Sequence, residues 1–283
     1  MRIVNCEIDG VPGIAADEGA GWHGLSHSDS GFPGTLPELI AQGADLLSVG
    51  RTLGHSPSVD LKSVRLLPPV PAPSKILCVG LNYDDHLQES GLKKPEYPEI
   101  FARFPSSLIA HQEPIRRPRE SSALDYEAEL AVVIGKPGRR IPQEQALDHV
   151  AGYSLFNDAT LRDFQLRTPQ WTMGKNFDGT GSFGPWLVTP DAVPPGARGL
   201  RIQGRLNGRV MQDSRTDLLI FSVPVLIATI SVAMTLERGD VIITGTPGGV
   251  GAARKPPVFM QPSDVYEVEI DGLGVLTNPV QQG

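Results

Sequence analysis

Cysteine and positive charge are both scarce in this chain of 283 residues. It has two cysteines, Cys6 and Cys78, which are too few for a disulfide framework or a thiolate zinc site. Each lies beside a short apolar stretch, where a buried free thiol is common. The formal net charge is −7 and no segment is dense in lysine or arginine, which argues against nucleic acid as a partner. We therefore expect a cytoplasmic protein in a reducing compartment.

Signals for secretion and for membrane insertion are also lacking. The N-terminal residues MRIVNCEIDG carry charges of both signs and lack the long apolar core of a signal peptide. One long uncharged run, residues 218–236, is interrupted by Pro224 and by serine and threonine, and acids border it on both sides. It predicts a buried helix over 223–236 that begins beside Pro224, and no membrane partner.

Glycine and proline, in contrast, are plentiful. The 31 Gly and 26 Pro make up a fifth of the chain, against roughly 12% in average proteins, and both residues mark turns. Strand-like stretches outnumber helical ones, so the fold class is expected to be α+β and β-rich. The proline-laden segment LLPPVPAPSK predicts a boundary between a small N-terminal domain, residues 1–70, and a catalytic domain, residues 71–283.

Several segments show the pattern of one element clearly. Residues 36–41 predict a short helix, VAGYSLFND predicts a strand that ends at Asp158, and TLRDFQLR predicts a short helix after it. Asn207-Gly208 is typical of the turn of a β-hairpin. The segments VYEVEI and VLTNPV predict a second hairpin near the C-terminus.

A pair of acids lies within the apolar stretch DYEAELAVVIGK. Glu127 and Glu129 alternate with apolar residues, so a strand would place both carboxylates on one face. Burying two like charges is costly without a counter-charge, which a divalent cation would supply; a solvated face is the simpler interpretation of the pair alone. Asp158 favours the metal, because three carboxylates suit Mg²⁺ or Mn²⁺ and leave positions for water and a chelating substrate.

A histidine and a glutamate form a second candidate pair. KILCVGLNY predicts a strand that runs into a short helix, NYDDHLQES, with Asn82 as its cap. His86 and Glu89 would lie on one face of that helix. Glu89 could orient the imidazole so that His86 takes a proton from water, although such a pair alone is more often a surface contact.

Two glycine-rich segments match nucleotide-binding motifs without their structural context. Residues 179–184 fit G-x-G-x-x-G, but Pro185 stands where a helix should begin. Residues 245–251 lack the Lys-Ser/Thr pair of a P-loop and could instead offer backbone N–H groups to a carboxylate. We expect neither a dinucleotide site nor a P-loop.

Five segments, in order, resemble the fumarylacetoacetate hydrolase superfamily, in its branch of acylpyruvate hydrolases and 2-hydroxyhepta-2,4-diene-1,7-dioate isomerases. The segments are GLNYDDHLQESG, DYEAELAVVIGK, VAGYSLFNDATLRDFQ, WTMGKNFDGTGSFGPW and TGTPGGVG with the following KPPVFMQPSDVYEVEIDGLG. They cover most of residues 75–275. The resemblance implies a mixed β-barrel or β-roll catalytic domain, a small N-terminal domain and a homodimer. One departure is Ser263, where the family commonly has glycine in a P-G-D turn.

The resemblance also implies a role for each candidate residue. The expected ligands of Mg²⁺ or Mn²⁺ are Glu127, Glu129 and Asp158. The expected catalytic residues are His86, Glu89 and Lys175. The expected substrate-binding residues are Arg162, Gln165 and Thr246.

A metal-dependent hydrolase that cleaves a C–C bond in an acylpyruvate-type 2,4-dioxo acid is therefore expected, in the catabolism of aromatic compounds or sugar acids. His86 would activate water, Lys175 would stabilise the oxyanion, and pyruvate would leave as a metal-bound enolate. Decarboxylation of oxaloacetate and isomerisation of a 2-hydroxydienoate pass through the same enolate and stay open, because a fold does not select a reaction. The non-enzymatic alternative is a protein that binds oxo acids.

Overall fold

The structure is a computed structural model that describes residues 1–90 and 93–283. The helices are α1 (Leu36–Gln42), α2 (Leu46–Leu53), α3 (Asp84–Ser90), α4 (Arg162–Gln165), α5 (Thr172–Lys175) and α6 (Val223–Ala233). The 3₁₀ helices are η1 (Pro105–Ser107), η2 (Gln143–His149), η3 (Pro190–Ala192), η4 (Pro195–Ala197), η5 (Thr216–Leu218) and η6 (Gly251–Ala253).

The strands belong to three sheets. The large sheet contains β1 (Arg2–Ile8), β2 (Val11–Asp17), β3 (His23–Ser26), β4 (Arg65–Leu67), β5 (Ile76–Gly80), β6 (Glu99–Arg103), β7 (Leu108–Ile109), β10 (Ala128–Ile134), β11 (Val150–Asp158), β13 (Gly181–Val188) and β16 (Val241–Ile243). The second contains β8 (Ile115–Arg117), β14 (Arg201–Leu206), β15 (Arg209–Arg215), β17 (Val265–Ile270) and β18 (Gly274–Gln282). The third pairs β9 (Leu124–Asp125) with β12 (Thr160–Leu161). The expected β-rich α+β class is confirmed.

The large sheet is strongly curled. Its strands run in the order β3-β2-β1-β13-β11-β10-β16-β5-β6, and β7 pairs with β13. In a flat sheet β6 and β13 would lie roughly 24 Å apart, yet the five-residue step from Arg103 to Leu108 spans at most about 18 Å. The sheet therefore bends round until the chain leaving β6 reaches β13. Over the described residues the ladder keeps two free ends, so the expected barrel is an unclosed curl.

Strand β10 separates two hydrophobic cores. Its even-numbered residues, such as Leu130, pack into the core shared with the five-stranded sheet and α6. Its odd-numbered residues, such as Ala131, face the inside of the curl. Glu127 and Glu129 continue this odd-numbered series and are buried, so a solvated face, the simpler interpretation of the acidic pair, is wrong.

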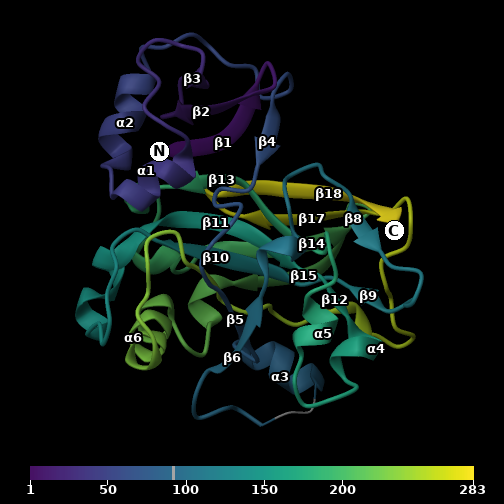
Figure 1. Cartoon of the computed structure of the whole chain (residues 1–283). Helices are drawn as coiled ribbons and strands as arrows, with labels where there is room; N and C mark the ends of the chain where they lie inside the picture. The colour runs from purple at the N-terminus through teal and green to yellow at the C-terminus, as the bar shows by residue number, and fades with distance from the viewer. Residues whose placement is uncertain (91–92) are drawn as a thin grey trace.

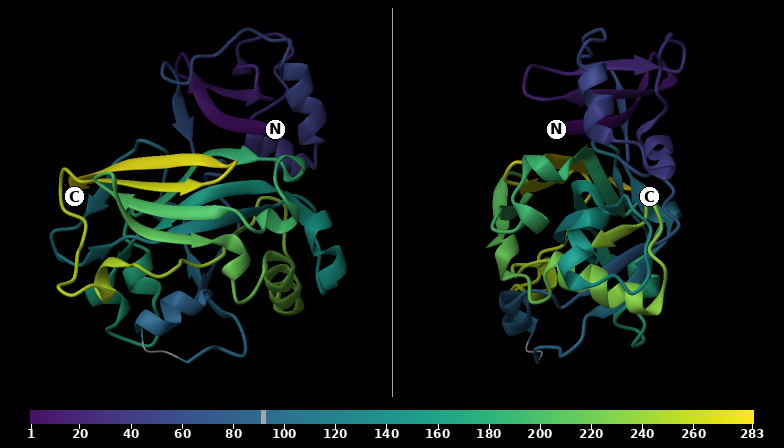
Figure 2. Two further views of the ribbon diagram at one scale, coloured as in Figure 1. Left: turned by 180° about the vertical axis from the view of Figure 1, so that it is seen from behind. Right: turned by 90° about the vertical axis from the view of Figure 1, so that its left-hand side faces the viewer.

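Residues 1–70 form a unit at one end of the curl, at the top of Figure 1 and in both views of Figure 2. A capping box between Thr35 and Glu38 begins α1, and Gly43, with a φ of 73°, ends it. Apolar residues of α1 and α2 join the core inside the curl, while α3, α4 and α5 lie at the opposite end (Figure 1). Helix α1 confirms the prediction at 36–41, and α2 was not predicted. A separate domain at 1–70 stays a prediction.

Most of the other predicted elements are present with small changes at their ends. VAGYSLFND is β11, and Asn207 and Gly208, both with positive φ, join β14 to β15. Helix α6 begins at Val223 as expected and ends at Ala233, three residues early. Among the described residues no helix has the length and apolarity to cross a membrane.

Two further expectations concern single segments. The G-x-G-x-x-G match runs into strand β13 rather than into a helix, as expected. Cys6 and Cys78 are free and buried. Asn82 is not a helix cap. Its side-chain Nδ2 donates to the backbone carbonyls of Phe221 and Thr244, and its side-chain Oδ1 accepts from the Phe221 N–H.

Candidate active site

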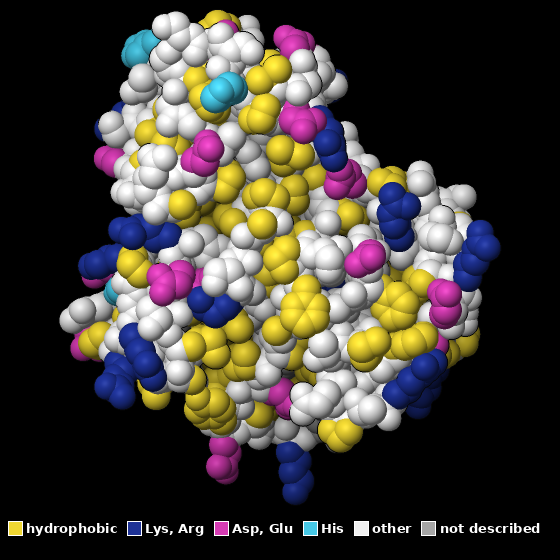
Figure 3. All heavy atoms as spheres, viewed as in Figure 1, with side chains coloured by type: hydrophobic (Ala, Val, Ile, Leu, Met, Phe, Trp, Pro, Cys, Tyr) yellow, Lys and Arg dark blue, Asp and Glu magenta, His cyan; other side chains and the backbone are white. Residues whose placement is uncertain are grey.

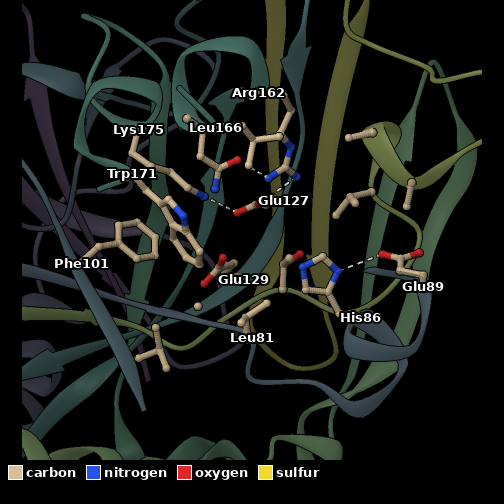
Figure 4. Close-up of a pocket in the computed structure, with 17 residues that line it drawn as sticks. Leu81, His86, Glu89, Phe101, Glu127, Glu129, Arg162, Leu166, Trp171 and Lys175 are labelled. Carbon is tan, nitrogen blue, oxygen red and sulfur yellow. Dashed lines mark hydrogen bonds and ion pairs between the residues drawn. The ribbon is translucent and has the colours of Figure 1, made fainter. Parts of the chain in front are cut away.

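A cavity of about 370 Å³ lies at the end of the curl where α3, α4 and α5 gather (Figure 4). Eight of the nine predicted site residues line it: His86, Glu89, Glu127, Glu129, Arg162, Gln165, Lys175 and Thr246. The ninth, Asp158, is fully buried and binds Lys175. The structure thus brings together every residue that the sequence proposed for the site.

Antiparallel pairing of β10 and β11 assembles the three acids. Ala128 lies opposite Asn157, so the start of β10 meets the end of β11. Glu127, Glu129 and Asp158 each offer a carboxylate oxygen, and these oxygens lie within 4.8 Å of one another. All three side chains are buried, which makes their mutual repulsion costly in the absence of cations.

Three basic side chains alternate with the acids. Lys175 donates from Nζ to Glu127 Oε2 and Asp158 Oδ2, both at 2.6 Å. Arg162 lies between Glu127 and Asp125, with N–O distances of 2.7 and 2.8 Å. Asp158 also binds Arg103. The result is a buried chain of alternating charge, which we call the ion chain: Arg103, Asp158, Lys175, Glu127, Arg162 and Asp125.

The ion chain separates the pKa values of the two glutamates. Burial alone would raise the pKa of Glu127, but Lys175 and Arg162 outweigh burial and lower it. Glu129 lies off the chain, and burial together with the nearby Asp158 and Glu127 carboxylates raises its pKa well above the usual range. Burial would lower the pKa of Lys175, yet Asp158 and Glu127 raise it, so the ammonium stays charged.

The glycine-rich loop at 245–251 closes over the acids. The Gly245 N–H donates to Glu129 Oε2, and Thr246 donates from its hydroxyl to the Ala128 carbonyl at 3.0 Å. Asp125 accepts the N–H groups of Gly251 and Ala252 at 2.7 and 2.9 Å. This loop does offer backbone N–H groups to carboxylates, although in this structure the carboxylates are the protein's own.

The predicted His–Glu pair lies on α3. His86 Nδ1 is 2.9 Å from Glu89 Oε1, and Glu89 Oε2 accepts the Gly249 N–H at 2.8 Å. The second ring nitrogen, Nε2, points back toward the acids in Figure 4. Because the other oxygen of Glu89 holds the loop, the orientation of His86 depends on both α3 and the loop. This geometry suits a general base at the cavity.

Two aromatic rings form the opposite wall. Phe101 and Trp171 meet edge to face with their centroids 5.4 Å apart, and the Lys175 ammonium lies 4.9 Å from the centre of the Phe101 ring. Trp171 packs directly on Gly80, where an added Cβ would come within 2.4 Å of its ring. Leu81 beside it has a left-handed φ of 56° and also lines the cavity. This wall is the aromatic side of the cavity.

The three carboxylates fit a hard divalent cation. They are all-oxygen donors, which Mg²⁺ and Mn²⁺ prefer, and a cation would relieve the repulsion that raises the pKa of Glu129. The structure therefore supports an acidic metal site; the donors do not distinguish Mg²⁺ from Mn²⁺.

Sequence reasoning missed Arg103, Asp125, Phe101 and Trp171. Arg103 and Phe101 lie within the apolar stretch IFARF, where a charged residue was an available signal. Asp125 continues the alternation of Glu127 and Glu129 by two residues, so the same period points to it. Trp171 lies in a loop segment that carries no such pattern.

Comparison with known proteins places this geometry in a family. The family model described as fumarylacetoacetate (FAA) hydrolase, C-terminal, matches residues 75–281. The chain is 40% identical over 288 residues to a mitochondrial oxaloacetate tautomerase of Xenopus laevis, covering 99% of this chain and 90% of that protein.

Solved structures agree over the full length. A fumarylacetoacetate hydrolase from Exiguobacterium antarcticum superimposes with a TM-score of 0.86 at 38% identity, covering 100% of both chains. A maleylpyruvate hydrolase from Sphingobium, solved with manganese(II) and pyruvate, gives 0.81 at 29% identity, also covering 100% of both. The chain belongs to the fumarylacetoacetate hydrolase family.

Proposed function

We propose that this protein is a divalent-metal-dependent enzyme that interconverts the enol and keto forms of oxaloacetate. Several reactions are open to this site, and we choose tautomerisation because the chain is similar to the Xenopus laevis tautomerase over 99% of its length. The site supports it because moving a proton between C3 and the 2-oxo oxygen needs one base, one oxyanion stabiliser and no water.

The metal ligands in this proposal are Glu127, Glu129 and Asp158. When bound, a divalent cation would act as a Lewis acid that stabilises the negative charge developing on the substrate. Mg²⁺ and Mn²⁺ are both suited to these ligands.

The chain's own residues supply the proton transfer. His86 takes the C3 proton on Nε2, and Glu89, 2.9 Å from Nδ1, stabilises the resulting imidazolium. The Lys175 ammonium donates to the 2-oxo oxygen as negative charge builds on it. In the enol direction the His86 imidazolium then passes this proton to the 2-oxo oxygen, while Lys175 keeps its own protons, so the composition of the substrate does not change.

Polar residues on the cavity wall hold the substrate. Arg162 and Gln165, joined by a 3.0 Å hydrogen bond, present a guanidinium and an amide to a carboxylate. The Thr246 hydroxyl lines the same cavity and accepts from Gln212 Nε2 at 2.7 Å, which fixes its position.

Hydrolysis of an acylpyruvate is the second candidate. The oriented His86–Glu89 pair favours it, because that pair could equally activate water, and the fold is that of a maleylpyruvate hydrolase solved with pyruvate. The reactions open to this site differ in their products: hydrolysis and decarboxylation release pyruvate, and tautomerisation does not.

The test follows the ultraviolet absorbance of enol-oxaloacetate with chelator-stripped protein, before and after adding Mn²⁺ or Mg²⁺. We expect metal-dependent loss of the enol without pyruvate, abolished in His86→Gln and retained in His55→Gln, an exposed histidine outside the site. Acetylpyruvate is run in parallel with pyruvate quantified. Pyruvate from acetylpyruvate together with an unchanged rate of enol decay would replace the tautomerase by the hydrolase.

A further inference from the structure

Arg103 is the one cation of the ion chain that lies away from the cavity. It ends β6, its side chain is fully buried, and the cavity is lined by other residues. Because the sheet is curled, Arg103 contacts Asp158 on β11, which lies 55 positions later in the sequence. A buried arginine in this position does not touch substrate and acts through the carboxylate that it binds.

The guanidinium is fixed on every edge. Nη1 donates to Asp158 Oδ1 and to the Ala159 carbonyl, Nη2 donates to Thr180 Oγ1 at 2.8 Å, and Nε donates to Ser107 Oγ at 3.2 Å. Thr180 is fixed in turn by the Phe177 carbonyl at 2.7 Å. A planar group held by four partners presents its N–H to Asp158 in one orientation.

The backbone around Arg103 leaves room for this arrangement. Gly181, paired with Asp158 between β13 and β11, lies against the guanidinium, and a Cβ there would come within 2.9 Å of Nη2. Lys175 takes the other oxygen of Asp158, at 2.6 Å. Arg103 therefore holds Oδ1 while Oδ2 is turned toward Lys175 and the glutamates.

We propose that Arg103 is a positioning residue that holds Asp158 in the orientation required for a metal ligand. The inference rests on the metal centre of the proposed function. Partners that orient ligating groups commonly change metal affinity by about 10- to 100-fold when removed.

Two effects of removing Arg103 oppose each other. Loss of a nearby positive charge would by itself tighten cation binding. However, a fully buried carboxylate that loses its partner tends to turn toward another donor, and that change removes a metal ligand. Since Asp158 is completely buried, we expect the second effect to dominate.

The experiment measures Mn²⁺ affinity by isothermal titration calorimetry on chelator-stripped protein, so that it needs no activity. Arg103→Met is expected to weaken Mn²⁺ binding about 10- to 100-fold. Arg103→Lys keeps the positive charge but loses the planar guanidinium. Its Mn²⁺ affinity should lie between those of Arg103→Met and the wild type. Thr180→Val keeps Arg103 itself but removes one of its anchors, and should give a smaller loss in the same direction.

Lys75→Met is the matched control. Lys75 binds the fully buried Asp240 at 2.8 Å, at the end of β5 away from the cavity. The Lys75→Met substitution should lower thermal stability and leave Mn²⁺ affinity unchanged. This control separates general destabilisation from an effect on the metal site. Should Arg103→Met fail to fold, Arg103→Lys and Thr180→Val decide the question.

The outcomes separate the two proposals. Weaker binding in the Arg103 and Thr180 variants, with normal binding in Lys75→Met, supports the positioning role. Equal or tighter Mn²⁺ binding in the folded Arg103 and Thr180 variants overturns it and leaves the metal centre standing. A wild-type protein that binds neither Mn²⁺ nor Mg²⁺ overturns the metal centre itself.

Discussion

At the scale of single residues, Glu129 differs from the other two acids because Lys175 and the arginines do not bind it. Its raised pKa means that the folded, metal-free protein holds a proton that the unfolded chain releases. Stability contributed by that proton is present below the ordinary glutamate pKa of 4.5 and is lost as pH rises from there toward the raised value. The free energy of unfolding falls by up to about 1.4 kcal/mol per pH unit over this range.

Glu129→Gln tests this assignment. A neutral amide can still accept from the Gly245 N–H, so the chelator-stripped variant should unfold at an equal or higher temperature than wild type above pH 4.5, without the wild-type decline with pH. It should bind no Mn²⁺. Thermal unfolding from pH 4 to 8 measures the first effect, with exposed Glu120→Gln as the control. A parallel decline in both proteins would mean that Glu129 is not the titrating group.

Ser263 shows a departure from the family pattern at the same scale. Its φ of 79° is left-handed, which costs a side-chain-bearing residue roughly 1–2 kcal/mol; glycine recovers this but loses roughly 0.5–1 kcal/mol of chain entropy. Ser263→Gly should therefore stabilise the protein by about 0.5–1 kcal/mol in denaturant unfolding. Ser122→Gly, exposed and without positive φ, should slightly destabilise it.

At the scale of elements, α3 and the loop at 245–251 share one carboxylate. Glu89→Gln keeps the size of the side chain but removes the charge that orients His86 and binds the Gly249 N–H. The kcat of the enol assay should fall on the order of 100-fold with little change in KM. Asp84→Asn, exposed in the same helix, should leave kcat unchanged. A change in KM alone would assign Glu89 to substrate binding.

Some elements and site residues could be predicted from local sequence pattern, and others depend on the fold. Strands β10 and β11 and the Asn207-Gly208 hairpin follow from local period and turn chemistry, and the acids follow from the same period. Arg103 could not be placed, because its partner Asp158 lies 55 residues away and they meet only through the curl of the sheet. The role of His86 followed from its spacing to Glu89, the roles of Lys175 and Thr246 came from family resemblance, and the structure adds their proximity.

At the scale of the whole molecule, the curl has a site at one end and residues 1–70 at the other. Side chains of α1 and α2 share a core with Phe156 and Phe183 inside the curl, and uncovering such a side chain costs roughly 1.5–3 kcal/mol from a total stability of about 5–15 kcal/mol. A chain of residues 71–283 alone should therefore be insoluble or lack a cooperative melting transition. A soluble, cooperatively melting 71–283 protein would instead establish two independent domains.

The oligomeric state and the cellular location of the protein stay predictions. The homodimer and the cytoplasmic location are expectations from resemblance and composition. Leu166, directly after α4, and Met173, on α5, have exposed side chains. In Figure 3, apolar side chains gather down the middle of the visible face, and most charged side chains lie toward its margins. Sedimentation of the purified protein measures the oligomeric state directly.

The alternation of charge in the ion chain bears on the order of events during biogenesis. Lys175, Arg162 and Arg103 already compensate Glu127 and Asp158 from within the chain, so nascent protein can reach its native state before any ion arrives. In zinc fingers, by contrast, metal uptake and folding are a single event. Here the cation could bind, and later exchange, after the protein has folded, and its binding would add stability to a molecule that is already native.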